Sequence, residues 1–279
     1  MNVPRVVAVS VLIAALLSGC RHEKPPPPPV ETTPPLARLR VIFPEGFTRR
    51  EMVDRVGAVR EIAIRKRKVT PRLTARGYAR ASAGAQPPAE FRKEWSRTRS
   101  SEGFLFPATY EFTKLTTSER LVRDQLAFFR RQWRTVNLRY AKSKNLTPYD
   151  VLVIASMIEK EAVAAEERRL VAAVIYNRLR NGMPLGIDAT IRYGRNVPGT
   201  ESLKESDLET DSPYNSRLRV GLPPTPISNP GLASIRAAAR PARVDYLFFV
   251  RKPDGVHHFF TASESEFFQK KCEYGFGCG

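Results

Sequence analysis

The sequence predicts a mixed α+β fold, because two kinds of hydrophobic periodicity occur in different parts of the chain. Residues 147–182 carry apolar side chains at helical spacing, whereas the short runs at 39–43, 246–250 and 258–260 have the composition of strands. The chain has 279 residues, of which 42% are hydrophobic, so one large domain or two smaller ones can bury a sizeable core. We therefore expect short strands and longer helices around at least one substantial core.

The first twenty residues have the organisation of an export signal. One early arginine precedes an apolar run from Val6 to Leu17, and the sequence Leu-Ser-Gly-Cys ends at Cys20. This tetrapeptide resembles a bacterial lipobox, which predicts a lipoprotein signal peptide over residues 1–20 and a lipid on Cys20. An uncleaved membrane anchor is the alternative, although the apolar run is short for a span of about 20 residues. Both interpretations place the protein outside the cytoplasm, anchored to a membrane of the cell envelope.

The strong positive charge has to be explained in that compartment. The formal charge of +18 and the basic runs at 65–68 and 130–131 are typical of nucleic-acid-binding proteins, but the export signal excludes nucleic acid as a partner. Outside the cytoplasm, a basic protein is attracted to carboxylates of the cell wall and to anionic phospholipid surfaces. A solvated surface without a specific partner explains the same composition, and the sequence leaves both explanations open.

A proline-rich tether and a small module follow the signal. Residues 21–35 contain PPPPP and ETTPP, which predict a stiff, extended linker. The LRVIF run at 39–43 predicts a strand, and Thr48 with Glu51 forms a capping box that opens a helix. Residues 65–99 are basic, and we expect only short helices there, in an insertion that is either mobile or directed at a substrate.

The two helices within residues 147–182 carry the strongest local signals. Thr147 is the expected N-cap, Pro148 the first helical residue, and Asp150 a favourable charge in the first turn. The VLVIASMI run that follows is apolar on almost every side, which is typical of a buried helix. Asn181-Gly182 provides the stop signal of the second helix.

Two glutamates at the end of the first of these helices point in different directions. Glu159 and Glu161 are separated by about 200° of rotation around the helix axis. Glu161 follows Met157 and Ile158 by one turn, so it extends from the bulkier apolar side. Burial on that side raises a carboxyl pKa, as a general acid near neutral pH requires. The alternative is a helix terminus that carries ordinary surface charges.

The remaining segments fill out the expected order of elements. Residues 101–112 are rich in aromatic side chains, for which core packing is the simplest explanation, and 117–140 has the pattern of an amphipathic helix. Residues 232–239 predict a short helix, and the runs at 246–250 and 258–260 predict a β-hairpin.

Several sequence blocks, in a fixed order, resemble one family. They are PEGFT, EGFLFPATYEF, ASMIEKEA, the ER pair at 167–168, VAAVIYNRLRNGMPLGIDATIRYG, SPYNSRLRVGLPPTPISNPGLASIRAAARPA, DYLFFV and HFFTASESEF. Together they resemble the endolytic murein transglycosylases, the MltG or YceG-like family, over nearly all of the chain after residue 40. The resemblance implies an α+β protein with a small LysM-like α/β module at 36–100, including the basic insertion, followed by a lysozyme-like mixed catalytic domain at 101–279.

The resemblance also implies an activity. It identifies Glu161 as the general acid of a lytic transglycosylase, which cleaves the β-1,4 bond between N-acetylmuramic acid and N-acetylglucosamine and leaves 1,6-anhydro ends. Such an enzyme acts on peptidoglycan glycan strands, endolytically in this family, and terminates nascent strands beside peptidoglycan synthases. It needs no cofactor. A cell-wall-binding lipoprotein without catalytic activity, and a lysozyme-type hydrolase with a different product, are the alternatives.

The same blocks imply the residues that bind substrate. They are Asn177, Asp188, Thr190, Tyr214 and Asn215. An Asn side chain offers both a donor and an acceptor to an N-acetyl group, and a Tyr can stack on a sugar ring or bond to the catalytic carboxyl.

Two positions near these residues depart from the usual pattern of the family, and a third matches it. Gly186 stands where the family usually has Gln, and Ala189 where it usually has Pro. The missing Gln puts a contact with the sugar in doubt. His258 matches a family histidine, and as an isolated histidine we expect it to be structural.

Two cysteines remain after Cys20 is assigned to lipid. Cys272 and Cys278 form an even pair in an exported chain, which predicts a disulfide across a short, glycine-containing loop. Two cysteines without an adjacent histidine make a poor zinc site, so no metal is expected.

Overall fold

The computed structural model describes Met1 and residues 36–277, and these later residues form one compact unit. The signal peptide, Cys20, the tether and Cys278 lie outside the described residues. The strands among the described residues are β1 (Leu39–Ile42), β2 (Thr109–Phe112), β3 (Phe248–Arg251) and β4 (His258–Thr261). The helices of the described part are α1 (Arg49–Arg67), α2 (Ala75–Ala83), η1 (Ala89–Phe91), α3 (Arg92–Thr98), α4 (Ser118–Trp133), α5 (Arg139–Ser143), α6 (Pro148–Glu161), η2 (Ala165–Glu167), α7 (Arg168–Arg180), α8 (Asp188–Arg195), α9 (Glu205–Leu208), α10 (Leu232–Ala239) and α11 (Glu264–Glu273).

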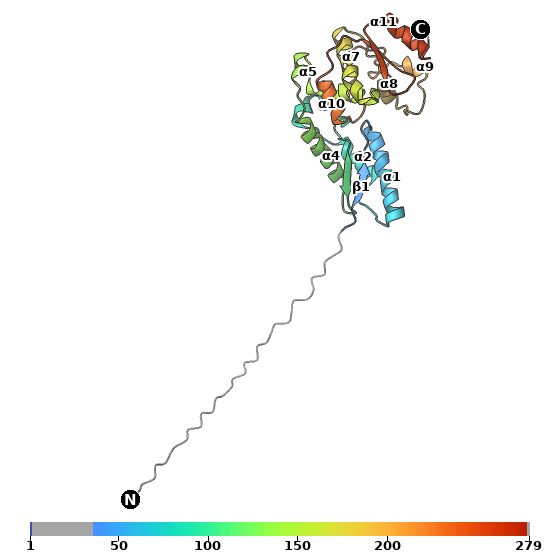
Figure 1. The fold of residues 1–279 in the computed structure, drawn as a ribbon. Helices are drawn as coiled ribbons and strands as arrows, with labels where there is room; N and C mark the ends of the chain where they lie inside the picture. The colour runs from blue at the N-terminus through green and yellow to red at the C-terminus, as the bar shows by residue number, and fades with distance from the viewer. Residues whose placement is uncertain (2–35, 278–279) are drawn as a thin grey trace. The chain divides into compact units, whose positions relative to one another are not determined.

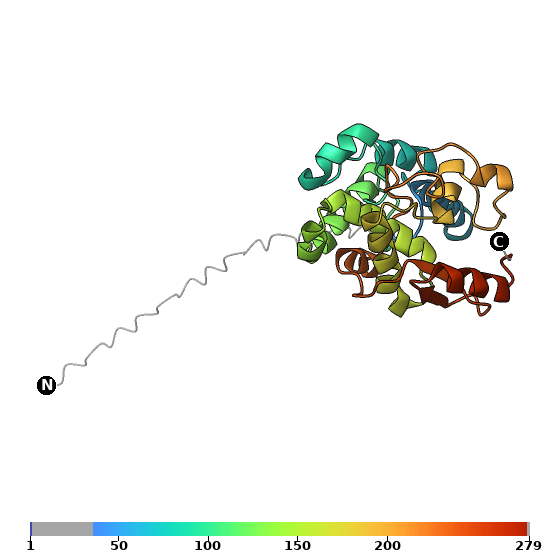
Figure 2. The same cartoon turned by 90° about the horizontal axis from the view of Figure 1, so that it is seen from above.

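The mixed α+β class predicted from the sequence is confirmed, and the elements gather in two regions. Figure 1 shows β1, α1, α2 and α4 at one end of the compact unit and α7, α8 and α11 at the other. Seen from above (Figure 2), the carboxy-terminal segment lies along one edge of the unit. Within residues 36–277, no helix is both long and apolar enough to cross a membrane.

The amino-terminal region is held together by an antiparallel strand pair. β1 pairs with β2, so that Val41 lies opposite Tyr110, and both side chains enter a small core beside Met52 and Tyr78. The capping box predicted for α1 is confirmed, because Thr48 accepts from the Glu51 N–H while the Glu51 carboxylate accepts from the Thr48 N–H.

Contacts of the amino-terminal region cross the predicted domain boundary between residues 100 and 101. β1 precedes that boundary and its partner β2 follows it, and the same small core also includes Leu121 and Val122 of α4. Strand pairing over such a sequence distance is not visible in a local pattern. The division into two domains stays a prediction.

α6 is the central element of the larger region. Its capping box is confirmed: Thr147 accepts from the Asp150 N–H, the Asp150 carboxylate accepts from the Thr147 N–H, and Pro148 begins the helix. Every residue from Val151 to Ile158 is buried, and α10 and α7 pack against this helix. Neighbouring elements therefore cover the apolar VLVIASMI run on each side. Glu161, the last residue of α6, lies at the edge of the core.

The predicted helix at 117–140 is interrupted in the structure. α4 ends at Trp133, and α5 begins at Arg139. The Asn137 side chain accepts a hydrogen bond from the Arg139 N–H at 3.0 Å, so it starts a new helix instead of continuing the first. The predicted hairpin is confirmed, because β3 pairs with β4 in antiparallel register.

Candidate active site

Glu161 lies at the carboxyl end of α6 and borders a pocket of about 240 Å³. The pocket lies between the start of α8, the β3–β4 hairpin and the last described residues. The polar and charged side chains that line the pocket with Glu161 are Arg178, Asp188, Arg217, Arg251, His258 and Lys271. Apolar side chains such as Leu185, Ile187 and Phe249 complete it.

Burial governs the protonation of Glu161. Loss of solvation raises the pKa of this carboxyl to about 7, and the negative charge of Asp188 adds to the rise. The positive charge of Arg251 and a hydrogen bond from the Ala189 N–H oppose it. Arg251 also donates to the main-chain oxygen of Glu161 at 3.3 Å. The carboxyl therefore exchanges its proton near neutral pH, where a general acid is most effective.

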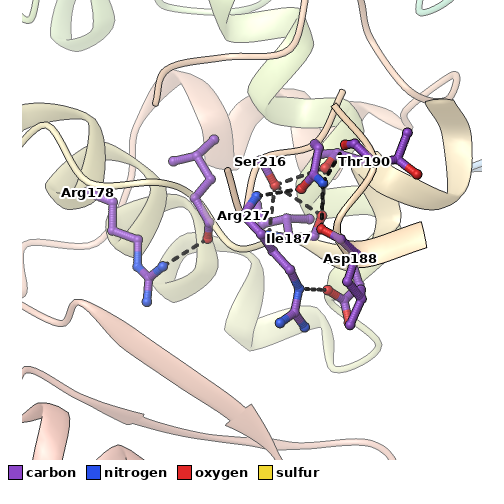
Figure 3. A network of polar contacts seen from close by, with 10 residues as sticks. Arg178, Ile187, Asp188, Thr190, Ser216 and Arg217 are labelled. Atoms are coloured by element: carbon purple, nitrogen blue, oxygen red, sulfur yellow. Dashed lines mark hydrogen bonds and ion pairs between the residues drawn. The ribbon is translucent and has the colours of Figure 1, made fainter. Parts of the chain in front are cut away.

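The segment that carries Asp188 is fixed by a polar network, drawn in Figure 3. Arg217 donates through Nε to the Asp188 carboxylate at 2.7 Å. Ser216 Oγ accepts from the Ile187 N–H at 2.9 Å and lies 2.9 Å from the Thr190 hydroxyl. These contacts tie residues 187–190 to residues 216–217, and they hold the first turn of α8 against the Glu161 carboxyl.

Glycine at position 186 creates a local difference from the usual family pattern. Its backbone has φ of +65°, and an added Cβ would lie 3.2 Å from Nη1 of Arg178. Arg178 is itself fixed, because it donates to the main-chain oxygens of Pro184, Leu185 and Leu247. A larger residue at 186 would therefore need both a strained backbone and a small shift of this guanidinium.

Glu159 has a separate, structural environment. Its carboxylate accepts the Gly231 N–H at 2.9 Å, directly before α10 begins. Glu45 lies against the same glycine, and the negative charge of Glu159 adds to the burial that raises the pKa of Glu45. Glu159 therefore supports a helix start on another side of α6, as the helical phase predicted.

Three of the residues predicted to bind substrate have side chains that are engaged by hydrogen bonds inside the fold, and their role in binding stays a prediction. Asn177 donates to the main-chain oxygens of Val244 and Tyr246. Thr190 is buried and bonds to Ile187. Asn215 is only 1% exposed. Its amide donates to the Leu208 and Thr210 carbonyls, and its side-chain oxygen accepts from the Arg217 N–H. None of the three side chains can turn toward a sugar without breaking these bonds.

Tyr214 borders a second, larger pocket of about 920 Å³ between α1 and α8. Its ring centroid lies 5.2 Å from that of Tyr193, and its hydroxyl lies 2.8 Å from the Thr225 hydroxyl. Of the five residues predicted to bind substrate, Asp188 thus lies in the Glu161 pocket and Tyr214 in the neighbouring one.

A further buried carboxylate, Glu102, lies on the wall of the larger pocket and was not among the residues predicted from the sequence. It accepts from the Arg49 N–H at 2.9 and 3.1 Å, from the Asn229 amide at 2.6 Å and from the Tyr193 hydroxyl at 3.3 Å. Burial raises the pKa of Glu102 to about 7, although the hydrogen bonds from these donors lower it. The signal was present in the block EGFLFPATYEF, where an acidic residue directly precedes an aromatic core segment.

No cluster of metal-ligating side chains occurs in the part of the chain that the structure describes. The predicted disulfide involves Cys278, which lies outside those residues, and it stays a prediction.

Two known proteins are similar to this chain over part of its length. Proteins named endolytic murein transglycosylase from Streptococcus pneumoniae (strain ATCC BAA-255 / R6) and Bacillus subtilis (strain 168) are 42% and 39% identical over 155 residues. These alignments cover 53% and 55% of this chain but only 28% and 42% of the two relatives, so the chain matches less than half of their length.

A solved structure and a family model extend the match beyond those segments. The crystal structure of a YceG-like protein from Listeria monocytogenes superimposes with a TM-score of 0.61 at 27% identity, covering 82% of this chain and 74% of that one. The model of the YceG-like family matches residues 13–273. The chain therefore belongs to the YceG-like family.

Proposed function

We propose that this protein is a peptidoglycan lytic transglycosylase and that Glu161 is its general acid. The observation that carries the proposal is a carboxyl with a pKa near 7 at the end of a buried helix, facing a pocket lined by polar side chains. The names of the two transglycosylase relatives support the same substrate class.

The reaction requires one group that first donates and then accepts a proton. Protonated Glu161 gives its proton to the oxygen of the β-1,4 bond as the bond from the muramic acid anomeric carbon to that oxygen breaks. The ionised carboxylate then takes the proton of the muramic acid 6-hydroxyl, whose oxygen bonds to the same anomeric carbon. The products are a free 4-hydroxyl on N-acetylglucosamine and a 1,6-anhydro muramic end, and Glu161 is protonated again. The nucleophile belongs to the substrate, so no second catalytic carboxylate is needed.

The neighbours of Glu161 suit this cycle. Burial keeps the acid protonated near neutral pH, while Arg251 and the Ala189 N–H stabilise the carboxylate that forms midway. Asp188 is engaged by Arg217, so it orients the pocket wall and adds negative charge near the developing oxocarbenium ion. Tyr214 and the larger pocket extend the path along which a glycan strand can lie.

The finer description of the fold is also a proposal. The antiparallel strands β1 and β2, joined through α1, α2, η1 and α3, support a LysM-like amino-terminal module. A buried helix that ends in the acidic residue supports a lysozyme-like catalytic region. The lipobox supports anchoring of the mature protein to an envelope membrane through lipid on Cys20, where glycan strands and their synthases are the expected partners.

Product analysis tests the proposal and separates it from both alternatives. Purified peptidoglycan is digested with wild type, Glu161→Gln and Glu159→Gln, and muropeptides are identified by mass spectrometry. We expect anhydro ends from wild type and Glu159→Gln and essentially none from Glu161→Gln. Reducing ends in place of anhydro ends would indicate a hydrolase. Binding of sacculi without any cleavage by wild type would indicate a non-catalytic wall-binding protein.

A further inference from the structure

A buried glutamate–histidine pair lies beside the Glu161 pocket and is not used by the mechanism above. Glu167 is the last residue of η2, and His258 is the first residue of β4. The Glu167 carboxylate accepts the main-chain N–H of His258 at 2.9 Å, and its other oxygen lies 2.7 Å from His258 Nδ1. The side chains are 8% and 2% exposed, so both groups are almost removed from solvent.

The hydrogen bonds assign the tautomer of His258. An ionised carboxylate can only accept, so Nδ1 carries the proton that points at Glu167. In the neutral ring Nε2 then carries a lone pair. Among residues 36–277, no side chain or main-chain group hydrogen-bonds to Nε2, and His258 is part of the wall of the pocket that contains Glu161.

The ring is also held in place by its aromatic neighbours. Phe249 meets it edge-on with centroids 5.3 Å apart, and Phe260 does so at 6.0 Å. With Nδ1 hydrogen-bonded to Glu167 and the ring in contact with these two aromatic side chains, the imidazole cannot turn Nε2 elsewhere at low cost.

Most of the polar side chains in the rest of the pocket are donors. Arg178, Arg217, Arg251 and Lys271 can only donate hydrogen bonds, and one oxygen of Asp188 already accepts from Arg217. Glu161 must keep its proton for the leaving oxygen. A sugar hydroxyl that enters this pocket can therefore be bound by a further acceptor that receives its hydrogen bond.

We propose that His258 Nε2 is that acceptor, which binds and orients a hydroxyl group of the sugar beside Glu161, and that Glu167 is a positioning residue that fixes the required tautomer. The proposal rests on the proposed function for the identity of the ligand as a glycan. It revises the expectation that His258 is purely structural.

Glu167→Gln provides a specific test, because the geometry dictates how the amide must lie. The His258 main-chain N–H can only donate, so the glutamine oxygen has to face it. The amide NH₂ then faces Nδ1, which must become an acceptor, and the proton moves to Nε2. A nearly isosteric change thus turns the proposed acceptor into a donor.

Two further variants separate this effect from loss of structure. His258→Asn keeps a donor near the position of Nδ1 but removes Nε2. Glu166→Gln is the matched control, because Glu166 is exposed and its carboxylate lies 3.6 Å from the exposed neighbouring His257. Circular dichroism and thermal unfolding of each variant establish that the fold is retained.

The measurement is binding of a peptide-free peptidoglycan tetrasaccharide by isothermal titration calorimetry, with all proteins also carrying Glu161→Gln to prevent turnover. We expect Glu167→Gln and His258→Asn to raise Kd about tenfold, the scale of one hydrogen bond, and Glu166→Gln to leave it unchanged. In parallel, ¹⁵N chemical shifts of the His258 ring should show the Nδ1–H form in the parent and the Nε2–H form after Glu167→Gln.

Several results would overturn the proposal. They are an unchanged Kd in His258→Asn, an Nε2–H or doubly protonated ring in the parent, or a parent that does not bind the sugar. If Glu167→Gln does not fold, His258→Asn and the parent ring spectrum decide alone. A different result would contradict the proposed function alone. In that case the parent binds the tetrasaccharide and needs His258 to do so, but the wild type makes no anhydro ends. The assignment of His258 would then stand.

Discussion

Glu161 and Glu102 have the same raised pKa but opposite surroundings. Burial brings both carboxyls to a pKa of about 7. Glu102 is surrounded by donors from α1, α8 and the loop at Asn229, whereas the Glu161 carboxyl receives a hydrogen bond from the Ala189 N–H and otherwise faces a pocket. A raised pKa therefore reports desolvation, and only the free face of Glu161 turns it into a usable acid.

Removing the Glu102 carboxylate should give the largest effect on stability. Glu102→Ala leaves the Arg49 N–H, the Asn229 amide and the Tyr193 hydroxyl without their acceptor, at a cost of about 3–5 kcal/mol in the free energy of unfolding. Urea denaturation checks this value, with Glu209→Gln at an exposed position as a control for general loss of charge. A variant as stable as wild type but inactive would move Glu102 into the catalytic machinery.

Glu161→Gln should raise the free energy of unfolding at high pH, whereas Glu102→Ala should lower it. The folded-state pKa of about 7 lies above the ordinary value of 4.5 for a glutamate, so ionisation of Glu161 opposes folding increasingly as pH rises from 4.5 to 7. Glutamine removes that penalty, and the variant should be more stable than wild type by up to about 3 kcal/mol at pH 8. At pH 4, where the acid is protonated, the two proteins should unfold at similar urea concentrations. Equal stability at both pH values would mean that Glu161 is well solvated.

Asn215→Ala should reduce stability more than it reduces turnover by folded molecules. Its amide and carbonyl satisfy two main-chain oxygens and the Arg217 N–H inside the loop, so truncation should cost about 2–3 kcal/mol. Melting temperature and anhydro-product rate at a low temperature measure the two quantities. Normal stability with a hundredfold loss of turnover would support the sugar-binding role expected from the sequence.

Arg251 should have the smallest effect, a displacement of the pH profile. Its positive charge lowers the pKa of Glu161, so Arg251→Met should raise that pKa. For a reaction that needs protonated Glu161, kcat/KM falls as pH rises through the pKa, and the variant should keep activity to higher pH. The pH dependence of kcat/KM between 5 and 9 checks this direction. Movement of the falling limb to lower pH would contradict the assigned charge interaction.

The sequence was sufficient where the determining interactions are local. The caps of α1 and α6 and the separation of Glu161 from Glu159 follow from helix geometry, because residues within a few turns of one another fix them. The β3–β4 hairpin is local in the same sense.

The environment of small polar side chains was not predictable in this way. Thr190 in the first turn of α8 and Asn215 on a loop are small polar residues, for which a sugar contact and an internal hydrogen bond look alike in sequence. Ser216 and the Leu208–Thr210 carbonyls decide between them, and those partners are brought close only by the fold. Glu102 and the β1–β2 pairing depend on contacts across still longer separations.

Glu161 can act as a general acid only if its carboxyl holds a transferable proton near neutral pH. A direct titration of this carboxyl tests that requirement. Side-chain carboxyl carbons of ¹³C-glutamate-labelled protein are followed by NMR from pH 4 to 9, with the Glu161 and Glu102 signals assigned from the spectra of Glu161→Gln and Glu102→Gln. We expect the Glu161 signal to titrate near pH 7 and kcat/KM to fall over the same range. A Glu161 midpoint close to 4.5, the ordinary value for a glutamate, would contradict the central claim.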